Sequence, residues 1–585
     1  MNVDLIIVLV YFFITLLTGF LFQKIGQTNI SSFFRGGGNM AWWMVGTTIF
    51  IVQFSAVTFT AHAARAFSEG INILGIFIGN IAGFVGSYLF FSARYRQTGL
   101  DTGGEVVRAR FGKVSEQFFI WINIPSTQIS AGLWLNGLAI AISAIMGWSI
   151  PMTIIAAGAL VTVISILSGA WGIVASDFIQ GIIIMIVSIL LAVVALSRVG
   201  GIGNMIAEFP HDFFLGQDMR FPMLIVAGFF LFLLRQNVTI NNMMQSYRFL
   251  ASRDTKSARK GAMLAVILMT VGTSIWFIPA WSAASLYPDA PYVFAETMGA
   301  RAREAIYVVF VQRVMPVGTL GLLAATLFAA SMSSMDSTIN ANAGLITKSF
   351  WAPIVRRNKA TPKELLRTGV VISFIMGGIA ILVGLFFDSL RDLPLFNLIM
   401  QVTILTQMPM QVPLFLGMII KKTPDWSGWG TTVFGFFISL FVTFILPIRR
   451  VVEMMGLDLS RREIQDLDMM YGIVAHLFIT GGFFLLTSLF YKEPVGERKK
   501  EREVFYKNVS TPVIRDYDIE LQKLDVEQRR RVGLLVMLSG LFFMLLVLVP
   551  NPIGGRLMFG VVGLIIIGAG FLLQRHKGKD GAGNS

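Results

Sequence analysis

The sequence of 585 residues contains no cysteine and only four histidines. The absence of cysteine excludes a disulfide framework and any site that depends on thiolate chemistry. Charged residues are also scarce, at 14% of the chain. The sequence shows no phosphate-binding loop and no metal-ligand spacing of histidines and carboxylates. With so few reactive groups, an enzyme is the weakest interpretation.

Apolar sequence is what the chain has in abundance. Hydrophobic residues make up 55% of it, and the mean hydropathy is +0.71. Apolar runs of about 18 residues or more, the length that crosses a bilayer, occur about fifteen times. Residues 1–4 carry no basic group of the kind that precedes a cleaved signal peptide, so we expect the first run to be retained. The composition predicts an all-α polytopic membrane protein with about 15 transmembrane helices.

The net charge of +14 is explained by where the basic residues stand. If the N-terminus lies outside, 34 of the 47 lysines and arginines fall in inside loops and 11 in outside loops. The remaining two, Arg65 and Arg235, fall within apolar runs. This excess is the positive-inside pattern, so the basic charge sets the topology and nucleic-acid binding loses its main support. We expect a multi-pass plasma-membrane protein with an outside N-terminus and a cytoplasmic C-terminus.

One apolar run, residues 321–350, carries polar groups on successive turns. Ser333, Asp336 and Ser337 are three and four residues apart and share one face of a helix, with Ala330 and Ser334 beside them. Their oxygens suit a hard, small cation, and an ionisable residue at membrane depth is by default a functional candidate. The alternative is that small residues merely permit close helix packing while Asp336 bonds to a neighbour.

A second run, residues 41–66, is also interrupted by polar groups. Its central part contains Gln53, Ser55 and Thr58, which favours a discontinuous helix whose free carbonyls ligate a cation. The alternative is a continuous helix that bonds to its neighbours. His62 and Arg65 lie further toward the outside, and we interpret both as vestibule or structural residues.

Two further ionisable residues lie in apolar runs. Asp177 has no positive neighbour in sequence, so it is either satisfied by a bound cation or acts as a helix N-cap. Arg235 must face the protein interior, because an arginine near the bilayer centre costs several kcal/mol unless paired or solvated. It either clamps an anionic solute or pairs with a carboxylate such as Asp177 or Asp336.

Several motifs in order along residues 30–422 resemble those of a known family. They include GAWGIVASDFIQG, QSYRFLASRDTKSARKG and, as the most specific, AASMSSMDS. The chain resembles the sodium:solute symporters, whose members include sodium/sugar and sodium/sialic acid cotransporters. The resemblance implies a LeuT-like fold with a 5+5 inverted repeat and accessory helices.

The resemblance also implies how the chain divides. Its parts would be an accessory N-terminal helix (1–30), inverted repeat 1 (40–199), inverted repeat 2 (200–422), two accessory helices (423–491), a charged cytoplasmic linker (492–531), and two C-terminal helices with a basic tail (532–585). The first helix of each repeat would be the broken one.

Carried over by position, the family's sites fall on the polar groups found above. The common sodium site would use Ile51, Phe54, Ala330, Ser333 and Ser334. A second sodium site would use Asp177, Ser333, Asp336 and Ser337. The solute site would draw on Gln53, Thr58, Phe77, Asn80, Arg235, Gln236, Asn237 and Gln401.

The match to the family's galactose-type contacts is partial. The expected carboxylate, asparagine and lysine become Phe77, Arg235 and Met269, the tyrosine gate becomes Val238, and only Gln401 is kept. A central arginine fits an acidic sugar, carboxylate or other anion better than a neutral hexose.

The implied function is sodium-coupled symport of a small polar organic solute by alternating access, with two sodium ions per cycle. The implied partners are Na+, the solute and the lipid bilayer, and the sequence suggests no nucleic acid and no obligate protein partner. The alternative is a sodium-dependent sensor or channel-like protein with the same fold.

Overall fold

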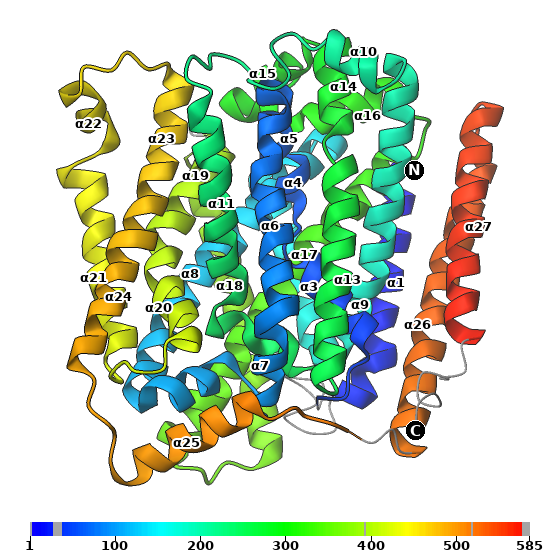
Figure 1. The fold of residues 1–585 in the computed structure, drawn as a ribbon. Coiled ribbons are helices and arrows are strands. Elements are labelled where there is room, and N and C mark those ends of the chain that lie inside the picture. The colour runs from blue at the N-terminus through cyan, green and yellow to red at the C-terminus, as the bar shows by residue number, and fades with distance from the viewer. Residues whose placement is uncertain (1–2, 27–37, 391–393, 516–518, 576–585) are drawn as a thin grey trace.

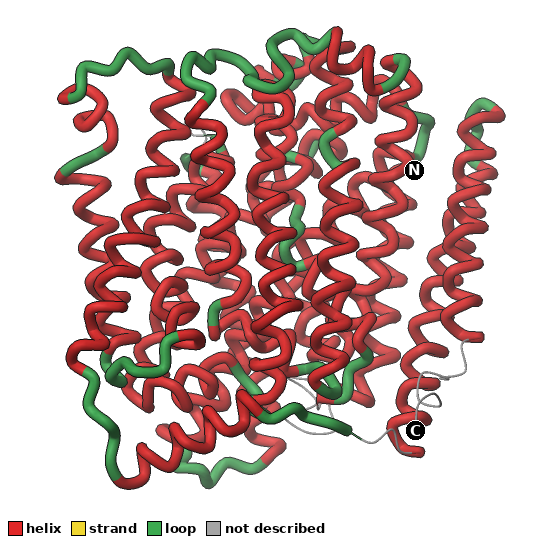
Figure 2. Tube along the Cα trace, viewed as in Figure 1, coloured by secondary structure: helices red, strands yellow, loops and turns green. Residues whose placement is uncertain are grey.

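The computed structural model describes residues 3–26, 38–390, 394–515 and 519–575. Within these ranges the chain is helical, and the β-structure consists of one isolated bridge between Met40 and Ser252 (Figure 2). Thirteen helical segments of the described chain are long and apolar enough to cross a membrane, and two more, Val3–Thr18 and Trp42–Ile51, are apolar but shorter. The all-helical polytopic fold is confirmed, whereas the number of about fifteen spans stays a prediction.

The first third of the chain forms the elements up to residue 207. They are α1 (Val3–Gly26), α3 (Trp42–Ile51), α4 (Ala56–Phe59), α5 (Ala61–Glu69), α6 (Leu74–Gly86), α7 (Ser92–Gln97), α8 (Gly103–Met146), α9 (Ile150–Val199) and α10 (Ile202–Ala207). Helix α8 bends at Gly112, where φ is 84°. Helix α9 contains two apolar segments, Ile150–Leu167 and Trp171–Val199.

The middle of the chain runs to residue 419. Its main elements are α11 (Met223–Asn241), α12 (Tyr247–Leu250), α13 (Thr255–Ile275), α14 (Ile278–Leu286), α15 (Ala295–Met298), η6 (Gly299–Ala305), α16 (Ile306–Val314), α17 (Thr319–Leu345), η7 (Ile346–Val355), α18 (Pro362–Asp388), α19 (Leu395–Val402), η8 (Thr403–Gln407) and α20 (Met408–Ile419).

The last part adds helices around this core. They are α21 (Ser427–Leu440), α22 (Ile448–Met454), α23 (Arg461–Val474), α24 (Gly481–Leu486), α25 (Gly496–Ser510), α26 (Ile519–Leu545) and α27 (Ile553–Arg575). Figure 1 shows α26 and α27 as a hairpin at one edge of the molecule and α25 lying across its lower end.

Helix α17 forms the centre of the fold. Every residue in its most apolar stretch is buried within the protein, although its polar content is high. It packs against α1, α8, α9 and α18. Because lipid does not reach this helix, its serines and Asp336 face protein on all sides, which is where polar side chains can find partners in a membrane.

Helix α25 joins separate parts of the chain at one end of the molecule. Arg498 pairs with Asp425 at 2.7 Å, and its Nη1 donates to Ala109 O of α8 at 3.1 Å. Further along, the N–H of Thr255 donates to Val513 O at 3.1 Å, at the start of α13. We call residues 496–515 the strap, because they contact α8, the turn after α20 and α13.

Candidate functional site

The chain is interrupted between α3 and α4, as one of the two sequence-based interpretations expects. Helix α3 ends at Ile51, α4 begins at Ala56, and Ser55 is extended, with φ −147° and ψ 174°. Backbone groups at the break therefore lose their helical partners. Two serines of α17 replace them: Ser331 Oγ accepts from Ala56 N at 3.1 Å, and Ser334 Oγ lies 3.0 Å from Phe54 O.

The oxygens of the expected first sodium site come together at this break. Ser334 Oγ lies 3.0 Å from Phe54 O and 3.5 Å from Ala330 O, and Ile51 O accepts from Phe54 N at 2.9 Å. All of these residues are fully buried. Neutral carbonyl and hydroxyl oxygens are the ligands that a hard monovalent ion prefers. The arrangement fits a cation, although Ser333 turns toward another partner.

That partner is Asp177, around which the expected second site is organised. Ser333 Oγ donates to Asp177 Oδ1 at 2.5 Å, and Thr48 Oγ1 donates to Asp177 Oδ2 at 2.8 Å. Asp177 lies well inside α9, so the N-cap interpretation is wrong. Thr48 was missed by sequence reasoning, because its surroundings, WWMVGTTIFI, read as a plain apolar helix.

A second carboxylate lies on the same side of α17. Asp336 is fully buried, and both of its carboxylate oxygens lack a hydrogen-bond partner within the described part of the chain. Ser337, the next residue, is 4% exposed. Neither Asp177 nor Asp336 forms an ion pair with a described residue, so a bound cation would neutralise charge that is otherwise uncompensated.

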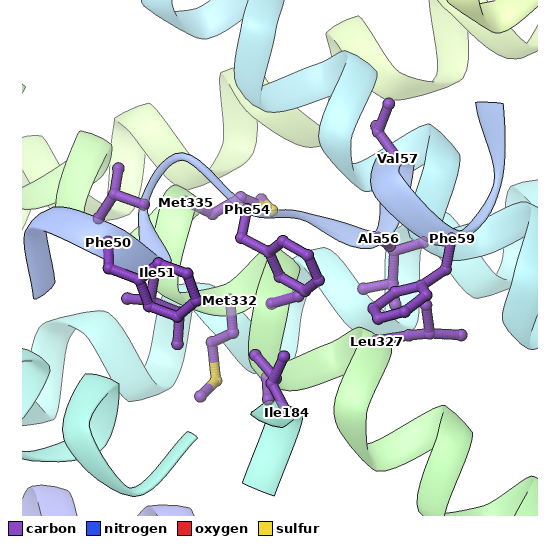
Figure 3. Close-up of a cluster of buried hydrophobic side chains, with 14 of the residues drawn as sticks. Phe50, Ile51, Phe54, Ala56, Val57, Phe59, Ile184, Leu327, Met332 and Met335 are labelled. Atoms are coloured by element: carbon purple, nitrogen blue, oxygen red, sulfur yellow. The ribbon is translucent and has the colours of Figure 1, made fainter. Parts of the chain in front are cut away.

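Aromatic side chains close one side of the break. Figure 3 shows Phe50, Phe54 and Phe59 packed against Met332 and other apolar side chains of α17. The ring of Phe54 lies 4.3 Å from that of Trp276, a residue that sequence reasoning did not single out. This wall excludes water, which strengthens the attraction between the site oxygens and a cation.

Arg235 is buried without the carboxylate partner that one interpretation proposed. It is 3% exposed, its Nη1 lies 4.0 Å from the sulfur of Met400, and its Nε is buried without a hydrogen-bond partner. The guanidinium forms no ion pair with any described residue. A buried charge in this state is costly, and an anion that enters the site would relieve the cost.

Helix α11 itself is continuous through Arg235. It runs unbroken from Met223 to Asn241, and the chain becomes extended only at Asn242, where ψ is 159°. The resemblance implies a break in this helix, but the chain leaves the helical conformation only at its end, at Asn242.

The other expected solute contacts divide into two groups. Gln236 Nε2 donates to Asn80 Oδ1 at 2.6 Å, and Asn237 Oδ1 lies 2.4 Å from where a Cβ on Gly86 would stand, so these residues hold α11 against α6. Gln53 lies half-buried at the break, and Thr58 is buried in α4.

Phe77 and Gln401 have different surroundings. Phe77 packs its ring 5.0 Å from Phe277 and 5.4 Å from His62, within the aromatic wall. Gln401 is exposed and lines a cavity of about 440 Å³ together with Asp468 of α23. The structure thus brings Gln401 to an accessory helix and away from the break.

A network of charges surrounds Arg65, which the sequence analysis interprets as a vestibule or structural residue. Arg65 pairs with Glu69 of its own helix and with Asp466 of α23, and Arg462 lies 3.6 Å from both carboxylates. Arg65 and Arg462 also line a cavity of about 310 Å³ that opens beside α19. The outer half of the broken helix is thereby tied to α23.

Comparison with known proteins gives consistent matches. The model of the sodium:solute symporter family matches residues 33–426. Sodium/glucose cotransporter 4 of Danio rerio is 23% identical over 465 residues, which cover 72% of this chain and 69% of that protein. The sodium/sialic acid symporter NanT of Aliivibrio fischeri is 24% identical over 412 residues, covering 68% and 79% of the two chains.

A solved structure shares the fold. A Na+-coupled sialic acid symporter in a substrate-bound, outward-open state superposes with a TM-score of 0.63 at 19% identity. The match covers 82% of this chain and 98% of that one.

Proposed function

The chain belongs to the sodium:solute symporter family, and from this premise we propose that it imports an anionic solute, an acidic sugar or another carboxylate, together with sodium. The protein is a multi-pass membrane symporter with the LeuT-like fold that couples sodium to a small solute. The observation that carries the proposed solute class is Arg235, a buried guanidinium without an ion pair among the described residues. Relatives that carry neutral and acidic sugars leave both classes open, and this arginine favours the acidic one.

We assign sodium to both groups of oxygens. The first cation site comprises Ile51, Phe54, Ala330 and Ser334 at the break, with Ser333 beside it. The second comprises Asp177, Ser333, Asp336 and Ser337, to which the contact to Asp177 adds Thr48. Two sodium ions per cycle would double the driving force that comes from the membrane potential, which is about 2.3 kcal/mol per charge per 100 mV.

The repeats would act as in alternating access. Residues 40–199 and 200–422 form the two five-helix units, and the remaining helices are accessory. Sodium at the break favours the outward-facing state and orders the solute site. The protein would lie in the plasma membrane with its N-terminus outside, so that sodium loss to the low-sodium interior releases the solute.

A screen followed by uptake tests the solute class. Purified protein is heated with neutral sugars, acidic sugars, amino acids and carboxylates, in sodium and in potassium. We expect anionic solutes alone to raise the melting temperature, and only in sodium. Counterflow of labelled solute in proteoliposomes then separates a transporter from a sensor or channel, and the charge moved per solute gives the sodium stoichiometry.

Arg235 is tested by substitution. Arg235→Ala removes charged hydrogen bonds worth about 1.5 to 3 kcal/mol each, so affinity for an anionic solute should fall more than tenfold. Arg235→Lys keeps the charge but loses the bidentate geometry, so its affinity for the solute should lie between those of Arg235→Ala and the parent protein. The control is Arg220→Ala, on the exposed arginine that pairs with Asp458. Unchanged uptake and sodium dependence in Arg235→Ala would contradict the assignment.

A further inference from the structure

The C-terminal hairpin of α26 and α27 packs more closely on itself than on the rest of the protein. A Cβ on Gly540 would stand 2.9 Å from Gly563 O, and one on Gly533 would stand 2.8 Å from Gly570 O, so the two backbones nearly touch. By contrast, the hairpin meets the core mainly along α1 and α9. The hairpin therefore meets the core along a narrow seam.

A cavity of about 260 Å³ lies in this seam, at the cytoplasmic end. Its wall is apolar except at one point: Phe178 and Ile182 come from α9, Val536 from α26 and Leu572 from α27, while Arg529 of α26 is the charged residue. A space of this size and composition fits part of an acyl chain, and the cation marks one end of it.

Arg529 is the arginine of this part of α26 that lines the cavity. Its Nε is buried without a hydrogen bond to any described residue, and its guanidinium lies 5.8 Å from the ring of Trp43. Arg531 instead pairs with Glu527 and donates to Leu21 O. Arg530 is exposed and does not line the cavity. Arg529 is therefore the arginine placed to take an anion at the mouth of the cavity.

We propose that this cavity binds an anionic phospholipid of the cytoplasmic leaflet, with its phosphate at Arg529 and one acyl chain against α9 and α27. The cytoplasmic leaflet is the one rich in anionic lipids, and basic pockets between transmembrane helices on that side bind their headgroups. The proposal uses the orientation given above, but it does not depend on which solute is carried.

The bound lipid would touch the transport machinery at two points. Phe178 lines the cavity and directly follows Asp177, the carboxylate of the second cation site. Trp43, at the start of the broken helix, lies beside Arg529 and packs its ring 4.6 Å from that of Phe178. The lipid therefore occupies the outer side of the same helices that hold the cation oxygens on their inner side.

Native mass spectrometry of the purified full chain tests the proposal. The protein is exchanged into equal amounts of phosphatidylglycerol and phosphatidylcholine with identical acyl chains. We expect one phosphatidylglycerol to be retained in preference. Equal retention of the two lipids, or retention of none, would overturn the proposal.

Two matched variants locate the lipid. Arg529→Gln should lower the preference for phosphatidylglycerol about fivefold, the loss of one basic contact near a charged membrane surface. Arg530→Gln removes the same charge one residue away and should leave the preference as in the parent. Equal effects of the two variants would show a diffuse surface attraction and overturn the site.

A third variant, Ala569→Trp, fills the cavity from α27 and keeps every arginine. It should abolish the retained lipid. The melting temperature in lipid-free detergent reports whether each variant is folded, so a loss of lipid in a folded variant is attributable to the site.

Discussion

At the scale of single residues, Asp177 carries the strongest argument for a cation. It sits inside a membrane-spanning helix, and its two donors, Thr48 and Ser333, are neutral hydroxyls from two other helices. Two hydroxyls do not compensate a full negative charge in a low dielectric. A sodium ion would do so and would join α3, α9 and α17 at one point.

Replacement of Asp177 separates the two cation sites. Asp177→Asn keeps the shape but removes the charge, so we expect sodium affinity at the second site to fall at least tenfold, with the charge moved per solute reduced by one. Sodium titration of the melting temperature and the charge-to-solute ratio measure this. Ser176→Ala, one residue before it, removes a hydroxyl bonded to Gln180 and should change neither quantity.

The first site is tested by Ser334→Ala, which removes the hydroxyl that meets Phe54 O and Ala330 O. We expect all sodium-dependent uptake to be lost, because both sodium and the break depend on this group. Sodium-driven uptake at wild-type rate in Ser334→Ala would contradict the first cation site.

Glu304, a buried residue of segment η6, links the stability of the protein to pH. Burial raises the pKa of Glu304 to about 7, although Arg301 and the N–H of Leu395 lower it in part. One oxygen accepts from Leu395 N at 2.6 Å, and the other is buried without a partner. The protonated form is thus favoured by folding.

The raised pKa of Glu304 makes the free energy of unfolding depend on pH. The contribution of Glu304 is fully present below its ordinary pKa and is lost as pH rises through about 7. We expect the melting temperature to fall between pH 5 and 8, and Glu304→Gln to flatten that slope. An unchanged slope in the variant, measured in the same detergent and salt, would show that other groups control it.

The sequence located most of the ionisable site residues but not their partners. Asp177 and Asp336 stand out because charge is rare in apolar runs, and Ser333 stands out because it belongs to the cluster of polar residues around Asp336. Ser333 does contact Asp177. Thr48 and Trp276 were invisible, since threonine and tryptophan are ordinary in such runs. Gln401 was assigned by position along the chain, and position does not determine which side of a helix faces the site.

At the scale of elements, α23 is tied to α5, the helix that follows the break. Arg65 of α5 pairs with Asp466 of α23, both being largely buried, and Arg462 adds contacts at 3.6 Å. Helix α5 cannot tilt away from α23 without opening this network. A helix that the sequence analysis expects to be accessory thereby restrains the chain beyond the break.

Arg65→Gln tests this restraint. It leaves two buried carboxylates with only Arg462, so we expect a destabilisation of about 3 kcal/mol, the cost of breaking a buried pair. The double variant Arg65→Gln/Asp466→Asn removes both charges and should recover part of it. The free energies of unfolding of Arg65→Gln, Asp466→Asn and the double variant, measured with denaturant, give the coupling energy. Additive losses would mean that the two side chains act independently.

Helix interruptions were predictable only in part. The break before Ala56 was visible because polar residues coincide with it, and the hydroxyls of α17 satisfy it. Helix α11 carries as many polar groups, yet it continues to Asn241. The side-chain amides of Gln236 and Asn241 donate to Asn80 and Gly83 O of α6, so the backbone stays helical. Polar content alone does not distinguish a broken helix from a bonded one.

At the scale of the whole molecule, the strap of residues 496–515 connects distant parts of the chain. One end docks on Asp425 and Ala109 O through Arg498, and the other meets Thr255 through Val513. In the proposed alternating-access cycle the two repeats would part at this end to release the solute, which would require the strap to slide or detach.

The movement of the strap can be tested by cross-linking, because the protein has no native cysteine that would form other disulfides. Val513 and Thr255 exchange two hydrogen bonds, at 3.1 and 2.9 Å, so cysteines at both positions lie within reach of one another. We expect the oxidised double variant Thr255→Cys/Val513→Cys to bind sodium and solute normally but to turn over slowly, and reductant to restore the rate. Full-rate uptake by the cross-linked protein would show that this end of the strap stays in place throughout the cycle.

The unpaired guanidinium of Arg235 also affects the relative rates of solute exchange and net uptake. When the empty transporter returns to its outward-facing state, the charge of Arg235 must pass through the occluded state with no counter-ion. When the transporter returns with an anionic solute bound, the solute is the counter-ion. The return of the empty transporter is then the slow step of the cycle. Exchange of solute across the bilayer should therefore be faster than net uptake.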